Sequence, residues 1–165
     1  MKTGRIFMLI ALIYAIGQTV YFYSRMPPVM ASHFGPDGHA NGWQSKEAFF
    51  GFSCGITAIL AFVFMGMPIF IRRLPNRLIN LPHKDYWLAP ERREASLAYL
   101  ANQMELIGAS ALFLVSVILH FSITANQSAD KTLSPMVVMP MVFIFVIFEF
   151  VCIIKMLRHF SIRPT

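Results

Sequence analysis

The chain has 165 residues, of which 56% are apolar and 13% are charged, whereas soluble domains average about 45 to 50% and about 25%. A water-soluble fold of this size leaves much of its surface exposed and has no room to hide so much apolar surface, so lipid is indicated as the surrounding solvent. The net charge of +6 then fits membrane orientation and attraction to anionic lipid head groups, and it argues against a nucleic-acid partner.

Four apolar runs are long enough to cross a bilayer, which takes roughly 20 residues per helix. Barrel strands would alternate apolar and polar residues, whereas these runs are apolar on every side. We therefore expect an all-α membrane protein, a four-helix transmembrane bundle in a single domain over residues 1–165. In chain order the predicted spans are residues 6–23, 49–71, 106–124 and 136–154.

The basic residues are distributed unevenly around these spans, and the positive-inside rule converts that distribution into an orientation. Eleven of the 14 lysines and arginines lie before the first span, between the second and third, or after the fourth. We expect both termini and the 72–105 connection to be cytoplasmic and the 24–48 loop to be external. The three basic residues on the outer side are Arg25, Lys46 and Lys131.

The first span has an alternative reading as a cleaved signal peptide. Residues 1–5 form a basic n-region, and Ala15-Ile16-Gly17 loosely matches a small-x-small cleavage site. The apolar run continues past that site to Tyr23. We therefore expect a retained membrane anchor.

The stretch HFGPDGHANGWQSK, residues 33–46, concentrates turn-forming residues between the first two spans. Asp37-Gly38 and Asn41-Gly42 are turn-forming pairs, because glycine accepts a positive φ without steric cost. We therefore expect this loop to be ordered and turn-rich, forming a compact cap over the outer helix ends.

Three side chains of this cap suit the membrane interface. Phe34 and Trp43 are expected to dip toward the lipid head groups, and Lys46 is expected to reach a lipid phosphate. Two roles stay open for the cap. It either only ties the first two spans together or also forms a recognition surface.

The second span contains Gly51 and Gly55 in a small-xxx-small spacing, which lets two helix backbones approach closely in lipid. We favour packing within the chain, and contact with a second copy stays open. Cys54 and Cys152 are expected at opposite ends of the bundle, too far apart for a disulfide. Each is expected to behave as a small buried apolar residue.

The connection between spans two and three carries Pro75, Pro82 and Pro90, which disfavour helix at the residue before each of them. We expect an irregular cytoplasmic segment in which Tyr86 and Trp87 lie at the head-group level. The third helix is predicted to begin at Pro90, before the bilayer, because proline fits the first position of a helix.

Glu149 is the most costly residue in the chain, since a carboxylate in hydrocarbon needs a partner or a proton. Helix geometry places it at the depth of Ser110 on the third span, so we predict a hydrogen bond between them. Glu105, at the cytoplasmic mouth of that span, is a candidate to join the pair. A structural polar clamp is the favoured role, and proton or ion movement is the alternative.

Polar residues also gather near the outer ends of the spans, where Gln18 and His120 are expected at similar depth below His33 and His39. The histidine spacing matches no zinc pattern, so ordinary interfacial hydrogen bonding is expected and no metal or other cofactor. No nucleophile and base stand at a credible spacing, and no phosphate or dinucleotide motif occurs. We expect a protein that is not an enzyme.

The pattern MPPVMASHFGPDGHANGWQSK resembles a bacterial membrane domain of unknown function that is found at the N terminus of SdpI-type immunity proteins. The segment LPNRLINLPHKDYWLAPERRE is similar to short four-span relatives. The resemblance implies a multi-pass protein of the bacterial inner membrane with a role in toxin immunity or sensing, while SdpI-type proteins carry further spans after this domain. The matching positions are Pro27, Pro28, His33, Phe34, Gly35, Gly38, Gly42, Trp43, Ser45 and Lys46.

The sequence therefore leaves two functional hypotheses. The first is recognition of a peptide or another membrane protein by the external loop, and the second is a small transporter or channel component that uses Glu149. For the first, the candidate binding residues are the loop positions His33, Phe34, Gly35, Asp37, Gly38, Gly42, Trp43, Ser45 and Lys46.

Overall fold

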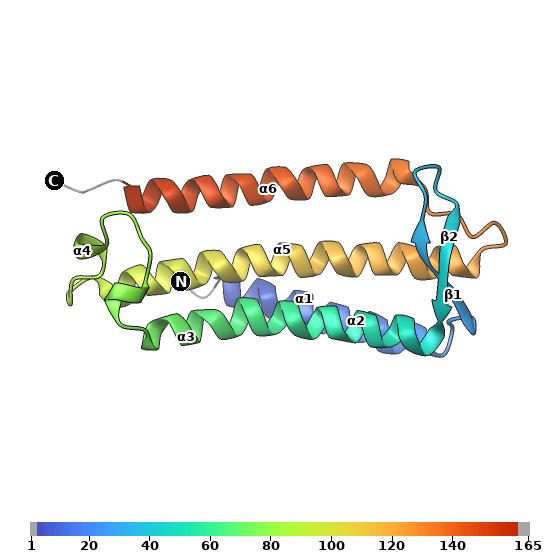
Figure 1. Cartoon of the computed structure of the whole chain (residues 1–165), viewed down its shortest axis with the longest axis horizontal. Helices are drawn as coiled ribbons and strands as arrows, with labels where there is room; N and C mark the ends of the chain where they lie inside the picture. The colour runs from blue at the N-terminus through green and yellow to red at the C-terminus, as the bar shows by residue number, and fades with distance from the viewer. Residues whose placement is uncertain (1–2, 162–165) are drawn as a thin grey trace.

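The computed structural model describes residues 3–161, so Lys2 and Arg163 of the predicted cytoplasmic charge lie outside the described part. Four helices in this range are long and apolar enough to cross a membrane, which confirms the predicted four-helix bundle. They lie side by side, with a small two-stranded sheet at one end and short helical segments at the other (Figure 1). The elements in order are α1 Thr3–Tyr23, β1 Val29–Phe34, β2 Ala40–Ser45, α2 Lys46–Ala61, η1 Phe62–Gly66, α3 Met67–Arg73, η2 Asn76–Leu78, α4 Lys84–Trp87, α5 Arg93–Gln127 and α6 Pro135–Ser161.

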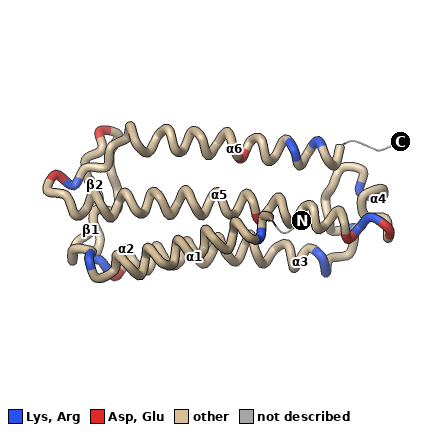
Figure 2. Tube along the Cα trace, turned by 180° about the vertical axis from the view of Figure 1, so that it is seen from behind, with Lys and Arg blue, Asp and Glu red and all other residues tan. Residues whose placement is uncertain are grey.

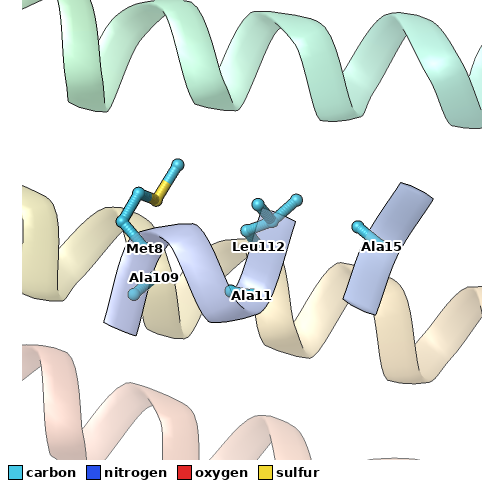
Figure 3. Close-up of a cluster of buried hydrophobic side chains, with 5 residues drawn as sticks. All are labelled: Met8, Ala11, Ala15, Ala109 and Leu112. Carbon is cyan, nitrogen blue, oxygen red and sulfur yellow. The ribbon is translucent and has the colours of Figure 1, made fainter. Parts of the chain in front are cut away.

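Helices α1 and α5 form the tightest pair of the bundle. Three of the five side chains buried in this core are alanines, which let the two backbones approach closely, as packing in lipid requires. Figure 3 shows the cluster where α1 overlaps α5, with Met8 extending toward the second span. It consists of Met8, Ala11, Ala15, Ala109 and Leu112.

The second span runs as one apolar helical rod from Lys46 to Arg73. Its α-helical hydrogen bonding changes to a π-helical turn at η1. Pro68 follows this turn and has no N–H to donate to the carbonyl of Phe64, four residues earlier, which accounts for the local change in hydrogen bonding. The turn positions the Phe64 ring on α5, where a Cβ built on Gly108 would lie 2.3 Å from the Phe64 Cβ. Gly108 is therefore a point of close helix contact.

The prediction that Gly51 and Gly55 of the second span pack against another helix of the chain is wrong. A Cβ built on Gly51 or Gly55 meets no atom within 4 Å. The close helix contact falls at Gly108 instead, because the Phe64 side chain needs the space that a missing Cβ leaves. The cysteines are both free, but only Cys152 is buried; Cys54 is exposed, contrary to expectation, because its side of α2 has no neighbouring helix.

The connection between α3 and α5 is more ordered than predicted. A small apolar cluster of Ile79, Leu88 and Leu97 closes it against the start of α5. The Trp87 indole Nε1 donates to the Phe160 carbonyl at 2.9 Å, which fastens the end of α6. Helix α5 begins at Arg93 and not at Pro90, because residues 90–92 form a turn before it.

Helix α6 is the least buried of the four. Only 6% of the residues in its most apolar 18-residue stretch are buried, against 39% for α5. It lies along α5 on the side away from α2 and α3, so that α5 stands between them in Figure 1. Most of its large apolar side chains are exposed, which is the pattern of a helix that faces lipid.

Charged residues are nearly absent from the middle of the bundle and gather at its two ends (Figure 2). At the end that carries α4, Arg5 donates to Glu105 with Nε at 2.8 Å from the carboxylate, and Arg72 pairs with Glu94. Glu149 lies within α6, away from either end of that helix.

Candidate functional site

The loop between the first two spans folds into a β-hairpin, a regular structure that the sequence did not predict. Strands β1 and β2 are antiparallel, with Val29 opposite Ser45 and Ala31 opposite Trp43. The register shifts around His33, which faces Gly42. The sequence predicted a turn at Gly42, but this residue lies in strand β2. A Cβ there would come within 2.9 Å of the His33 Cβ, so only glycine fits the bulged register.

The tip of the hairpin is a tight turn built by the residues that the sequence singled out. The Gly35 N–H donates to the His39 carbonyl at 2.8 Å, and the Asp37 carboxylate accepts from the His39 N–H at 3.1 Å. Gly38 has a φ of +82°, as the turn prediction requires. Its carbonyl accepts from the Leu133 N–H at 2.9 Å, so the tip is joined to the loop between α5 and α6.

Asn126, near the end of α5, fixes the hairpin to the membrane helices. Its Oδ1 accepts from the Ala31 N–H at 2.6 Å, and its Nδ2 donates to the Ala31 carbonyl at 2.9 Å. A second Nδ2 bond reaches the Ser122 carbonyl at 2.9 Å. Asn126 is 3% exposed and Ala31 fully buried, so this side chain acts as a neighbouring strand would for one residue of β1. The hairpin is therefore a rigid part of the bundle.

Trp43 presents a large apolar surface on this rigid support. The residue is 48% exposed, and the Lys131 ammonium lies 4.8 Å from its ring centroid. Lys131 adopts a left-handed backbone conformation with a φ of +44° that directs it here. A half-exposed indole offers a large apolar contact area, and its exposed face is available both to lipid head groups and to another molecule.

The outer edge of β2 is open beside Trp43. Both backbone polar groups of Ala31 bond to Asn126, so the Ala31–Trp43 pair is of the non-hydrogen-bonded kind. In such a pair the N–H and C=O of Trp43 also point away from the partner strand. Outside the hairpin ladder, no backbone hydrogen bond of the described residues involves them, and the nearest bridge to this strand joins His39 to Thr132. An unpaired edge of this kind is a template for an added strand.

Other loop residues hold the hairpin in place. The Ser45 Oγ accepts from the Ala48 N–H at 3.1 Å and caps α2, and the Lys46 N–H donates to the Pro28 carbonyl at 3.0 Å. The Lys46 ammonium lies 4.5 Å from the centre of the Tyr23 ring. The exposed His33 ring bonds to Asn41 on the opposite strand, and Phe34 is half-buried.

The predicted contact between Glu149 and Ser110 is present, so α5 and α6 share a polar pair within the membrane. The Ser110 Oγ also lies 2.8 Å from the carbonyl of Ile107. A hydroxyl has one hydrogen, so it donates either to Ile107 or to Glu149. In the first arrangement Ser110 accepts a hydrogen bond from a carboxyl group that holds a proton. In the second it donates to the carboxylate.

The other predicted intramembrane residues do not join this pair. Glu105 is 6% exposed and bonds to Arg5 of α1, because the N-terminal turn of α1 lies against α5. Gln18 donates to the Ser116 carbonyl at 2.7 Å between the same two helices. His120 packs edge-on against Phe22 with ring centroids 5.3 Å apart. The Gln18 Oε1 is buried and has no hydrogen-bond partner among the described residues. No chain of polar residues crosses the described bundle.

Within residues 3–161 no group of three histidine, cysteine or acidic side chains is placed to hold a metal ion. His33 bonds to Asn41, and His120 packs on Phe22.

Part of the chain matches a known protein family. Residues 6–57 match the family described as a domain of unknown function, DUF1648. The match covers most of α1, the hairpin and most of α2. This segment contains the loop motif on which the family resemblance in the sequence rests. No curated protein and no solved structure matches the chain. The match over residues 6–57 and the four helices long and apolar enough to cross a membrane fit an uncharacterised membrane protein.

Sequence reasoning missed two residues of the cap, Asn126 and Lys131. Both lie in or beside the polar segment between the third and fourth spans. The available signal was a single asparagine at the end of an apolar helix, where an amide in lipid must find partners. Its partner is 95 residues away in the chain, so local pattern could not name it.

Proposed function

We propose that this chain is a non-enzymatic receptor or immunity protein of the bacterial inner membrane, with both termini cytoplasmic, that recognises an extended peptide outside the cell. The observation that carries the proposal is the open edge of β2 beside the half-exposed Trp43. The resemblance of residues 27–46 to the external loop of SdpI-type immunity proteins points the same way, since toxin immunity needs an external recognition surface.

The recognition mode that fits this edge is strand addition. A peptide that pairs with β2 gains backbone hydrogen bonds from the free N–H and C=O of Trp43, while its side chains meet the indole. The Lys131 ammonium beside the ring favours a peptide with an acidic group at that position. Because Asn126 already fixes the hairpin, little ordering entropy opposes binding.

Replacing Trp43 with alanine is expected to weaken such binding by roughly thirtyfold, because a central aromatic anchor contributes about 2 kcal/mol or more. The test begins with random twelve-residue peptides displayed on phage and selected on the full chain in nanodiscs. The dissociation constants of the selected peptides are then compared between the unmodified chain and Trp43→Ala by biolayer interferometry.

Tyr86→Ala serves as the matched control, because it removes an aromatic ring at the opposite end of the bundle. It should leave the dissociation constant unchanged. Equal affinity of the unmodified chain and the Trp43→Ala variant, with both correctly inserted, would overturn the proposal. Loss of binding in Tyr86→Ala as well would show that the selected peptides do not recognise the hairpin.

The Glu149–Ser110 pair supports a second candidate, a small proton-coupled transporter or channel component. Its two hydrogen-bond arrangements differ by one proton on the carboxyl group, which is what a relay station needs. Against a relay, the described residues supply no second station near this pair, since Glu105 is held by Arg5.

If Glu149 carries protons, Glu149→Gln should reduce proton flux by at least tenfold while the bundle stays folded, because the amide keeps a hydrogen bond to Ser110 but does not titrate. Flux is measured with a pH-sensitive dye inside proteoliposomes under an imposed potential, with empty liposomes as the blank. Equal flux in the unmodified protein and Glu149→Gln removes this candidate and leaves the pair as a structural clamp.

A further inference from the structure

Helices α1, α5 and α6 enclose a groove with a volume of about 680 Å³, within the range of roughly 300 to 1,000 Å³ that is usual for ligand sites. Its walls are mainly apolar and include Phe7 and Ile10 of α1 and Leu106 of α5. The groove arises because α6 contacts α5 and leaves the neighbouring face of α1 uncovered.

One end of the groove is closed by aromatic rings within the membrane. Tyr14 of α1 and Phe113 of α5 lie with ring centroids 6.0 Å apart, and Phe148 of α6 completes this end. A chain of methylene groups that enters from the other end therefore stops against them. The shape suits an acyl chain.

The opposite end of the groove is polar and basic. Gln103 and Lys155 line it, and among the described residues neither forms a side-chain hydrogen bond or an ion pair. Lys155 lies six residues beyond Glu149, about 9 Å nearer the helix end at 1.5 Å per residue. This is the end of the bundle at which α1 and α5 begin and most basic residues are found (Figure 2).

We propose that the groove is a binding site for one anionic phospholipid of the surrounding bilayer. An acyl chain lies between α1, α5 and α6 against the ring cluster, and the phosphate group accepts from Lys155 and Gln103. A basic pocket between membrane helices on the basic side of a protein is the setting in which anionic head groups bind. The lipid fills the space that α6 leaves and joins it to α1.

A second copy of the chain fits this groove less well than a lipid. A protein helix packed there would bury the Lys155 ammonium, which has no acidic partner on the described part of this chain, at a cost of several kcal/mol. A phospholipid supplies both the apolar chain and the compensating negative charge.

The proposal is tested on the full chain reconstituted with equal amounts of phosphatidylglycerol and phosphatidylcholine that carry the same acyl chains. After extraction in mild detergent, native mass spectrometry counts the lipids that each protein molecule retains. We expect one retained phosphatidylglycerol, favoured at least tenfold over phosphatidylcholine.

Four variants separate the site from general charge attraction. Lys155→Gln should bring the two lipids to equal retention, whereas Lys155→Arg should keep the preference. Arg158→Gln removes the same charge one turn along α6 but does not line the groove, so it should keep the preference as well. Leu106→Trp fills the groove and should lose the retained lipid of either kind.

Several outcomes would overturn the proposal. These are equal retention of the two lipids by the unmodified chain, an unchanged preference in Lys155→Gln, and an equal loss in Arg158→Gln. A mass corresponding to two chains without lipid would show that a second copy covers the groove. Peptide binding at the hairpin is a separate property, so either result leaves the proposed function to its own test.

Discussion

Replacing Asn126 with alanine is expected to destabilise the protein by about 3 to 5 kcal/mol and to release the hairpin from the bundle. The substitution removes three hydrogen bonds and leaves the N–H and C=O of the fully buried Ala31 without partners. Each buried group left unsatisfied costs about 1 to 3 kcal/mol, which is more than a typical bond contributes. The change is measured by unfolding in mixed detergent micelles and by hydrogen exchange over residues 29–45.

Gln127→Ala is the matched control, since it shortens the neighbouring amide side chain. Gln127 is exposed and makes a single 3.3 Å bond to the Arg25 carbonyl, so its loss should cost less than about 1 kcal/mol. If the Asn126→Ala variant kept the stability and the hairpin protection of the unmodified chain, the hairpin would not depend on this clamp. The rigid edge required for strand addition would then lack its support.

Gly108→Ala is the second substitution with a large expected effect. The added Cβ would lie 2.3 Å from the Phe64 Cβ and 2.4 Å from its Cγ, so the second span must move away from α5 or Phe64 must leave its position. Overpacking of this kind costs about 1 to 3 kcal/mol. The fraction folded in a denaturant titration with sodium dodecyl sulfate measures the loss.

Gly55→Ala is the control for helix propensity, because a Cβ at Gly55 meets nothing within 4 Å. Alanine is favoured over glycine inside a helix by about 1 kcal/mol, so this variant should be unchanged or more stable. Phe64→Ala combined with Gly108→Ala should recover part of the lost stability, since the clash is then absent. A stable Gly108→Ala single variant would show that the second span is not held at this point.

Much of the fold follows from the sequence because bilayer physics acts on each segment separately. A run of about 20 apolar residues must form a helix to satisfy its backbone in lipid, so the four spans were predicted from composition alone. The Ser110–Glu149 contact was also predictable, because a carboxyl group in hydrocarbon has few acceptable neighbours and helix rise fixes its depth.

The choice among contacts of similar chemistry needed the tertiary structure. A missing Cβ allows close helix packing at any of Gly51, Gly55 and Gly108. Which of them meets a neighbouring helix depends on how each helix is rotated about its axis. Glu105 was a candidate to join Glu149 and Ser110, but the position of the α1 N-terminal turn pairs it with Arg5.

The hairpin marks the boundary between what the sequence by itself determined and what packing decided. The sequence determined an ordered cap with a turn at Gly38, because only glycine readily takes a positive φ there. It did not determine strands, since the segments VMASHF and ANGWQS carry few strand-forming residues. They pair because Asn126, far away in the chain, supplies the hydrogen bonds that a third strand would give, and only the folded bundle brings that side chain to Ala31.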